Sequence, residues 1–79
     1  MSKEKIREII IGHARDVLPG LADHQFLESD SLKGLGFNSI DRADVIMMTL
    51  ETLNKKMPLM ELARAENITD LARLIHEKP

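Results

Sequence analysis

The sequence contains no cysteine, no tryptophan and no tyrosine, and only two phenylalanines. The lack of cysteine excludes a disulfide framework and any metal site built on thiolates. Because aromatic side chains are so scarce, the core must be made of Leu, Ile, Val and Met side chains. A chain of 79 residues buries only roughly 60–65% of the surface that its unfolded form exposes, so we expect this aliphatic core to be thin.

The sequence also lacks a strong charge bias and a long apolar run. Its 11 basic and 13 acidic residues give a net charge of −2, which disfavours nucleic acid as a partner, because a phosphate-binding surface needs clustered positive charge. No apolar run approaches the roughly 18 residues of a membrane span, and the polar N-terminal residues do not form a signal peptide. We therefore expect a protein of the cytoplasm without membrane contact.

Catalytic constellations are absent as well. Catalysis by a nucleophile needs a base and a group that orients the base, but His13, His24 and His76 are scattered along the chain. Asp41 and Asp44 share a predicted helix face, where two carboxylates without a pocket are typical of a solvated surface. No metal-binding or phosphate-cradling motif occurs. We therefore expect that the protein is not an enzyme and binds no metal.

Apolar residues at spacings of three and four predict a first helix over residues 2–18, with Ser2 as its cap. Its predicted apolar face consists of Ile6, Ile9, Ile10, His13 and Val17. The irregular segment that follows, residues 19–38, is long for a compact domain. We expect this segment to have a short helical turn at residues 30–33, to expose His24, and to be anchored in the core by Leu21, Phe26, Leu27, Leu32, Leu35 and Phe37.

The second half of the chain predicts three more helices. A central helix covers residues 39–54, and a short helix over residues 59–63 begins after Pro58. A closing helix follows Thr69 as its N-cap, with Ile68 packing just before the cap. The sequence therefore predicts an all-α fold of four helices in a single domain, residues 1–79.

The predicted central helix is apolar on two faces. One stripe consists of Val45, Met48, Thr49, Thr52 and Leu53, and a second consists of Ile40, Ala43, Met47 and Leu50. A helix at the surface of a small bundle needs only one apolar stripe. The second stripe is either a docking face for a partner protein or a second contact with neighbouring helices, and periodicity does not choose between them.

A glycine-containing turn leads into this central helix. Asn38 can accept a hydrogen bond from the first N–H groups of the helix, and Asp41 follows three residues later, which is close to a capping box. Ser39 then lies in the first turn, beside the positive end of the helix dipole, where an exposed hydroxyl suits a phosphate diester. These residues alone equally fit a serine that only starts a helix.

The run Leu35-Gly36-Phe37-Asn38-Ser39-Ile40 resembles the Leu-Gly-x-Asp-Ser-Leu signature of acyl carrier proteins. The closing run Asn67-Ile68-Thr69-Asp70-Leu71 is also similar to the carrier pattern, so the resemblance covers nearly the whole chain. It implies a monomeric four-helix acyl-carrier-like bundle with a long first loop and a short third helix. It also implies a 4′-phosphopantetheine arm on Ser39, attached by a phosphopantetheinyl transferase, whose thiol carries acyl groups as thioesters.

The run Asn38-Ser39-Ile40-Asp41-Arg42-Ala43 is similar to a narrower group, the discrete carriers of polyketide β-branching cassettes. These carriers donate an acetyl unit to a hydroxymethylglutaryl-synthase-like (HMG-synthase-like) enzyme. The chain departs from the family at Asn38, where carriers have Asp, so a transferase that uses this carboxylate would work more slowly. The expected partner-binding residues are Ile40, Asp41, Arg42, Ala43, Asp44 and Met47.

Two alternatives stay open. The first is a general fatty-acid carrier or a peptidyl carrier, served by a ketosynthase or an acyltransferase. Fatty-acid carriers have a more acidic second helix, so Arg42 and the small net charge argue against that role. The second alternative is a small helical protein-interaction domain in which Ser39 is only part of the helix start.

Overall fold

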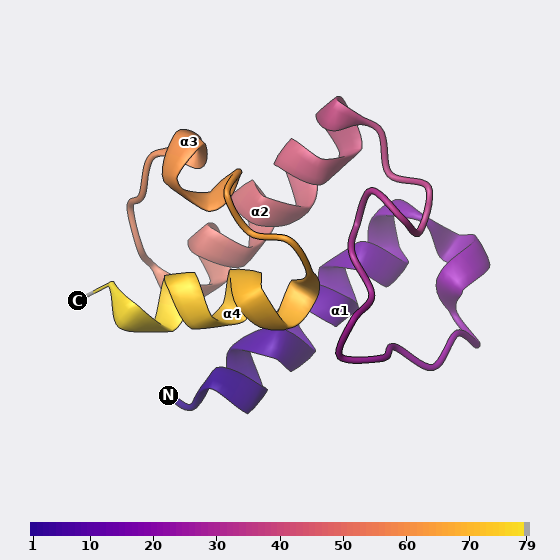
Figure 1. Cartoon of the computed structure of the whole chain (residues 1–79), viewed down its shortest axis with the longest axis horizontal. Coiled ribbons are helices and arrows are strands. Elements are labelled where there is room, and N and C mark those ends of the chain that lie inside the picture. The colour runs from indigo at the N-terminus through magenta and orange to yellow at the C-terminus, as the bar shows by residue number, and fades with distance from the viewer. Residues whose placement is uncertain (79) are drawn as a thin grey trace.

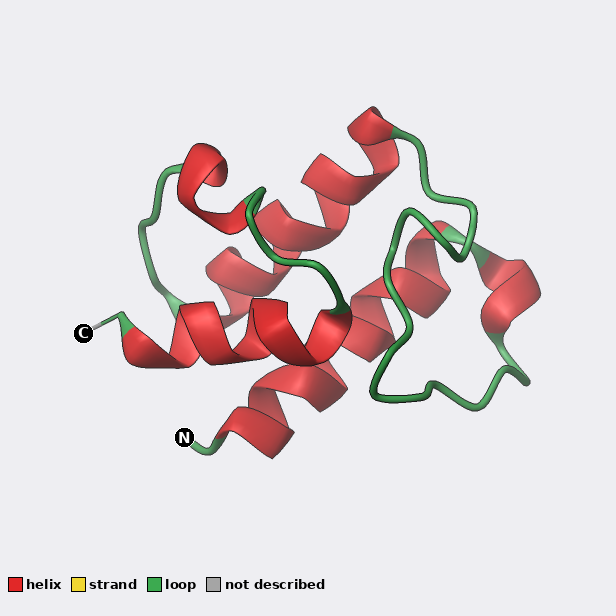
Figure 2. Cartoon of the chain, viewed as in Figure 1, coloured by secondary structure: helices red, strands yellow, loops and turns green. Residues whose placement is uncertain are grey.

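The computed structural model describes residues 1–78, and within this range the chain forms α-helices and no strand (Figures 1 and 2). The helices are α1 (Lys3–Val17), α2 (Ser39–Leu53), α3 (Leu59–Leu62) and α4 (Ile68–Glu77), and a short 3-10 helix, η1, covers Pro19–Leu21. The predicted all-α fold of four helices, with a long first loop and a short third helix, is confirmed.

Helix α1 holds the bundle together because it packs against both α2 and α4. Its buried face consists of Ile6, Ile10, Ile11 and Ala14. The prediction included Ile9 and Val17, which are only half-buried, in place of Ile11 and Ala14. The stripe is centred on residues 6, 10 and 14, one helical turn apart, so Ile9 and Val17 fall at its edges.

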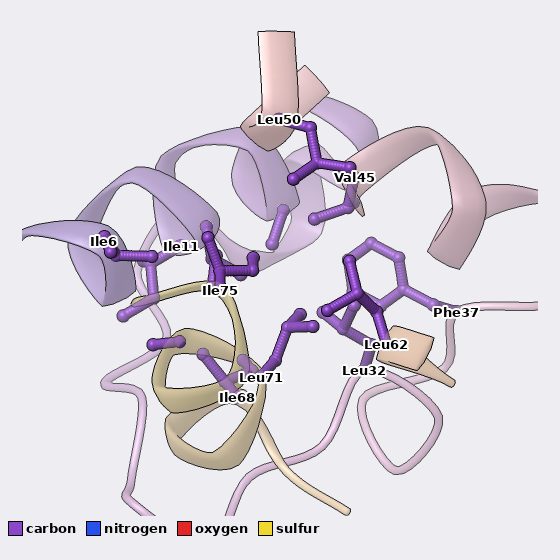
Figure 3. Packing of buried hydrophobic residues seen from close by; sticks show 13 residues of the cluster. Ile6, Ile11, Leu32, Phe37, Val45, Leu50, Leu62, Ile68, Leu71 and Ile75 are labelled. Atoms are coloured by element: carbon purple, nitrogen blue, oxygen red, sulfur yellow. The ribbon is translucent and has the colours of Figure 1, made fainter. Parts of the chain in front are cut away.

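The long loop between α1 and α2 contributes to the core. Leu32 and Phe37 from this loop are buried, and Figure 3 shows them gathered with Leu62 of α3. Burying an aliphatic or aromatic side chain of this size stabilises the fold by about 1.5–3 kcal/mol. The loop is therefore an integral part of the fold, which explains why so long an irregular segment is accommodated.

Hydrogen bonds around Asp30 fix the middle of this loop. The Asp30 carboxylate accepts from the backbone N–H of Leu27 at 2.8 Å and lies 2.9 Å from His24 Nε2, and these two contacts, the first above all, hold the pKa of Asp30 below its usual range. The Asp30 carbonyl accepts from the backbone N–H of Ile68 at 2.9 Å, which ties the loop to the start of α4. His24 is therefore half-buried, and its ring lies 4.9 Å from that of Phe26. The prediction of an exposed His24 is wrong.

Two other predictions for the loop are also wrong. Leu27 does not anchor the loop, because its backbone bends around the Asp30 carboxylate and its side chain is left 62% exposed. Residues 30–33 do not form a short helix; the hydrogen-bonded turn lies slightly later, at residues 32–36, where the backbone N–H groups of Leu35 and Phe37 donate to the carbonyl oxygens of Ser31 and Leu32. The helical turn in this loop is η1 instead, which begins at a proline.

Helix α4 begins earlier than predicted. The Asn67 side chain accepts a hydrogen bond from the backbone N–H of Asp70 at 2.7 Å, so the N-cap is Asn67 and not Thr69. Ile68 is consequently the first residue of the helix and is completely buried, rather than packing before the cap. Both Asn and Thr cap helices well, and the burial of Ile68 favours the earlier start.

Two glycines give opposite expectations for stability. Gly36 has a φ of 103°, a conformation that L side chains rarely adopt, so Gly36→Ala should lower the free energy of unfolding by about 1–2 kcal/mol. Gly12 lies within α1 with open space around it, so Gly12→Ala should stabilise the fold by up to about 1 kcal/mol. Urea denaturation of both variants measures these changes, and a Gly36→Ala variant as stable as the wild type would contradict the conformational argument.

Candidate functional site

The start of α2 is fixed on both sides of Asn38. The Asn38 side chain accepts a hydrogen bond from the backbone N–H of Asp41 at 2.7 Å, which confirms Asn38 as the N-cap. Just before it, Phe37 is buried to 2% exposure and follows the positive-φ turn at Gly36. The turn, the buried ring and the cap leave Ser39 as the first residue of α2 in a single defined position.

Ser39 is exposed and lies at the edge of an open cavity of about 570 Å³. The cavity lies between the first turns of α2, the helix α3 and the start of α4. Apolar side chains form much of its wall: Leu32, Ala43, Ile46, Leu59, Leu62, Ile68 and Leu71. The Ser39 hydroxyl therefore has water on one side and a mainly apolar groove on the other.

Arg42 lies one helical turn after Ser39 and lines the same cavity. Its Nη1 donates a hydrogen bond to the Phe37 carbonyl oxygen at 3.0 Å, and the side chain is half-buried. Arg42 was also predicted as a partner-binding residue. The structure places part of its guanidinium against the chain's own backbone, at the residue that precedes the N-cap of α2.

The second apolar stripe of α2 divides into two parts. Leu50 is buried at 8% exposure, whereas Ile40 and Met47 are 72% and 53% exposed. Ala43 is half-buried in the wall of the cavity. The stripe is therefore core at Leu50 and free surface at Ile40 and Met47, so each of the two interpretations of the sequence holds for part of it.

Charged residues flank this free surface. Asp44 is exposed and Asp41 is half-buried, and both lie on the first turns of α2 near Ser39. Of the predicted partner-binding residues, Asp41 and Asp44 therefore place carboxylates on the same turns of α2 as the exposed Ile40, whereas Ala43 is half-buried.

Helix α3 adds exposed apolar side chains that the sequence did not identify. Met60 is 85% exposed and Leu59, which lines the cavity, is 39% exposed. A helix of four residues has no measurable period, so neither residue could be assigned to a face. Their only signal was their place in the short helix that follows Pro58.

The first stripe of α2 contacts α1. Val45 and Thr49 are buried, and the Thr49 hydroxyl donates to the Val45 carbonyl oxygen at 2.8 Å. His13 Nε2 lies 2.9 Å from the Thr52 hydroxyl, so His13, which was predicted on the apolar face of the first helix, joins α1 to α2.

Neither a candidate metal site nor a candidate membrane-spanning helix occurs among the described residues. Among residues 1–78 no group of three or more His, Asp or Glu side chains could hold a metal ion. Within the same range no helix is both long and apolar enough to cross a membrane.

Comparisons with known proteins agree with this geometry. Residues 8–75 match the family described as "PP-binding: Phosphopantetheine attachment site". Over 78 residues the chain is 42% identical to the polyketide biosynthesis acyl-carrier-protein AcpK of Bacillus subtilis (strain 168), covering 99% of this chain and 95% of that protein.

A solved structure is similar over the same length. It is described as the crystal structure of the curacin biosynthetic pathway HMG synthase in complex with acetyl donor-ACP. The match has a TM-score of 0.94 and 45% sequence identity, and it covers 99% of this chain and 100% of that chain.

The cap at Asn38 can be tested by substitution. Asn38→Ala removes the acceptor for the Asp41 N–H and should lower the free energy of unfolding by about 1 kcal/mol. Asn38→Asp keeps the acceptor and adds a negative charge at the positive end of the helix dipole, so its stability should equal or slightly exceed that of the wild type. Thermal melts of the unmodified proteins decide, and equal melting of Asn38→Ala and the wild type would mean that the side-chain cap contributes nothing.

Proposed function

The chain belongs to the acyl carrier proteins, the family with a phosphopantetheine attachment site, and we propose that Ser39 is the residue to which its arm is joined. Acyl carriers are not enzymes: the thiol at the end of the 4′-phosphopantetheine arm holds an acyl group as a thioester and presents it to other proteins. Membership of this family removes the alternative of an unrelated helical interaction domain.

The observation that carries the assignment is the setting of Ser39. It is exposed, it is the first residue of a capped helix, and it borders the cavity. Ser2 and Ser31 accept hydrogen bonds from the backbone N–H groups of Lys5 and Gly34, so their hydroxyls are engaged in local turns. Within residues 1–78 the hydroxyls of Ser29 and Ser39 have no such partner, but Ser29 lies in the loop and does not line the cavity, which leaves Ser39 as the residue for modification.

The surroundings of Ser39 fit a phosphodiester. The first N–H groups of a helix and its dipole stabilise an anion at this position.

Attachment by a phosphopantetheinyl transferase forms a bond from the Ser39 oxygen to phosphorus and breaks the pyrophosphate link of coenzyme A. Adenosine bisphosphate leaves, and the hydroxyl proton goes to a base of the transferase. The apolar cavity beside Ser39 leaves room for a bulky group at the hydroxyl.

Ser39→Ala should therefore abolish modification. Intact mass after incubation with coenzyme A and a broad-specificity phosphopantetheinyl transferase should show one added arm on the wild type and none on the variant. Ser31→Ala is the matched control, because Ser31 lines the same cavity and should still allow full modification. Addition of the arm to the Ser39→Ala protein would disprove the assignment.

For the partner, we infer that this carrier donates acetyl groups to an HMG-synthase-like enzyme in polyketide β-branching. The similarity to the solved complex supports this role, since the match covers the whole of that chain at 45% identity. The similarity to a polyketide carrier supports the same type of pathway. We expect the carrier to act as a monomer, because the exposed apolar side chains beside Ser39 must be free to meet the enzyme.

The exposed part of the second α2 stripe is suited to be the centre of this contact. Apolar anchors near the middle of an interface usually carry most of the binding energy, and charges at the rim act more on encounter rate and partner choice. Ile40 and Met47 provide the anchors, and Asp41 and Asp44 provide the charges, with Ala43 between them at the cavity wall.

The acetyl-loaded carrier should transfer its acetyl group faster to an HMG-synthase-like enzyme of a β-branching cassette than to a fatty-acid ketosynthase. The measurement is the mass of each enzyme over time after mixing with the loaded carrier. Met47→Ala and Ile40→Ala should each slow transfer to the first enzyme by roughly 5- to 30-fold, which corresponds to about 1–2 kcal/mol per anchor.

Leu27→Ala provides the control for this experiment. Leu27 is an exposed side chain of similar size to Ile40 and Met47, with 62% of its surface accessible, but it lies in the loop and does not line the Ser39 cavity. Its loss should therefore not change the rate of acetyl transfer.

The melting temperatures of the unmodified Ile40→Ala and Met47→Ala proteins show whether these two residues act only at the surface. Equal or reversed preference between the two enzymes would leave a general acyl carrier, the fatty-acid or peptidyl alternative.

A further inference from the structure

The guanidinium of Arg42 is incompletely used by the protein itself. Its Nη1 donates to the Phe37 carbonyl oxygen at 3.0 Å, which accounts for only part of its hydrogen-bonding capacity. Within residues 1–78 no carboxylate lies within ion-pair distance of Arg42, although acidic residues outnumber basic ones in this chain. The remaining N–H groups of this half-buried guanidinium are free to bind an anion.

The position of Arg42 on α2 directs its side chain toward Ser39. Residues three apart on a helix are neighbours on one face, and helical side chains tilt toward the N-terminus. The hydrogen bond to Phe37 agrees with this direction, because that carbonyl precedes the N-cap. Ser39 and Arg42 border the same cavity, together with Leu59 and Leu62 of α3.

The charges around this cavity favour an anion. Lys33 and Arg42 line it, against the single carboxylate of Glu66. Asn38, where acyl carriers usually have Asp, is neutral. A carboxylate at position 38 would both repel a neighbouring phosphodiester and compete for the Arg42 guanidinium.

We propose that Arg42 is a positioning residue that binds the phosphodiester formed on Ser39 and turns the arm toward the cavity between α2 and α3. The inference rests on the proposed attachment to Ser39. Arginine is suited to this task because its planar group donates two parallel hydrogen bonds to phosphate oxygens. The bond to Phe37 holds the side chain in place beforehand, so that little conformational freedom is lost when the phosphodiester is bound.

The experiment compares unmodified and modified forms of the wild type, Arg42→Gln and Lys33→Gln. Each protein is loaded with coenzyme A and a transferase, loading is verified by mass, and both forms are melted at low salt. Modification should raise the melting temperature of the wild type by about 2–5 °C more than that of Arg42→Gln. Lys33→Gln removes another positive charge from the same cavity and should keep the wild-type response.

A spectroscopic readout separates positioning from a general effect on stability. In the wild type, modification should shift the Nε–H resonance of Arg42 and slow its exchange with water, and the phosphorus resonance of the arm should move when Arg42 is replaced by Gln. Arg42→Lys keeps the charge but lacks the planar pair of donors, so it should restore only part of the difference in melting temperature.

Asn38→Asp tests the same idea without altering Arg42. It keeps the helix cap but adds a competing carboxylate, so modification should raise its melting temperature less than that of the wild type. Normal loading with equal melting shifts in the wild type, Arg42→Gln and Asn38→Asp would overturn the role of Arg42 and leave the attachment site intact. Failure of the wild type to gain the arm would overturn the proposed attachment and this inference together.

Discussion

The hydrogen bond between the Asn38 side chain and the Asp41 backbone N–H is the contact on which the candidate site depends. This bond fixes the residue at which α2 begins. Because Phe37, the residue before the cap, is buried, the helix cannot begin at a different residue without exposing that ring. A small domain with a thin aliphatic core has few other means of holding an exposed serine in one place. The stability of this turn and the precise presentation of Ser39 therefore have the same physical origin.

Helix α2 serves two surfaces at once. Its buried side, at Val45, Thr49 and Leu50, packs into the core shared with α1 and α4. Its other side leaves Ile40 and Met47 in water beside the cavity. The proposed partner contacts on α2 would therefore leave the packing that keeps its first turn in place undisturbed.

Much of the fold and the candidate site could be predicted from the sequence because the deciding interactions are local. Apolar spacing identified α1 and α2, since helical periodicity depends on residues within one or two turns. The cap at Asn38 could be read directly, since capping joins residues three apart in the chain. The same short run, Leu35 to Ile40, carried the resemblance to acyl carriers that the family match then confirmed.

Only the tertiary structure decided how exposed each apolar or polar residue is. Leu50 and Met47 belong to one stripe of one helix, yet only Leu50 is buried, because burial depends on which neighbouring element occupies the adjacent space. The folded loop brought His24 against Asp30 and left it half-buried, and the burial of Ile68 in the core selected Asn67 rather than Thr69 as the cap of α4. The sequence by itself determined the helices and the capped serine, which depend on neighbours along the chain. The cavity beside Ser39 was decided by the packing of α2, α3 and α4, because its walls come from segments far apart in the chain.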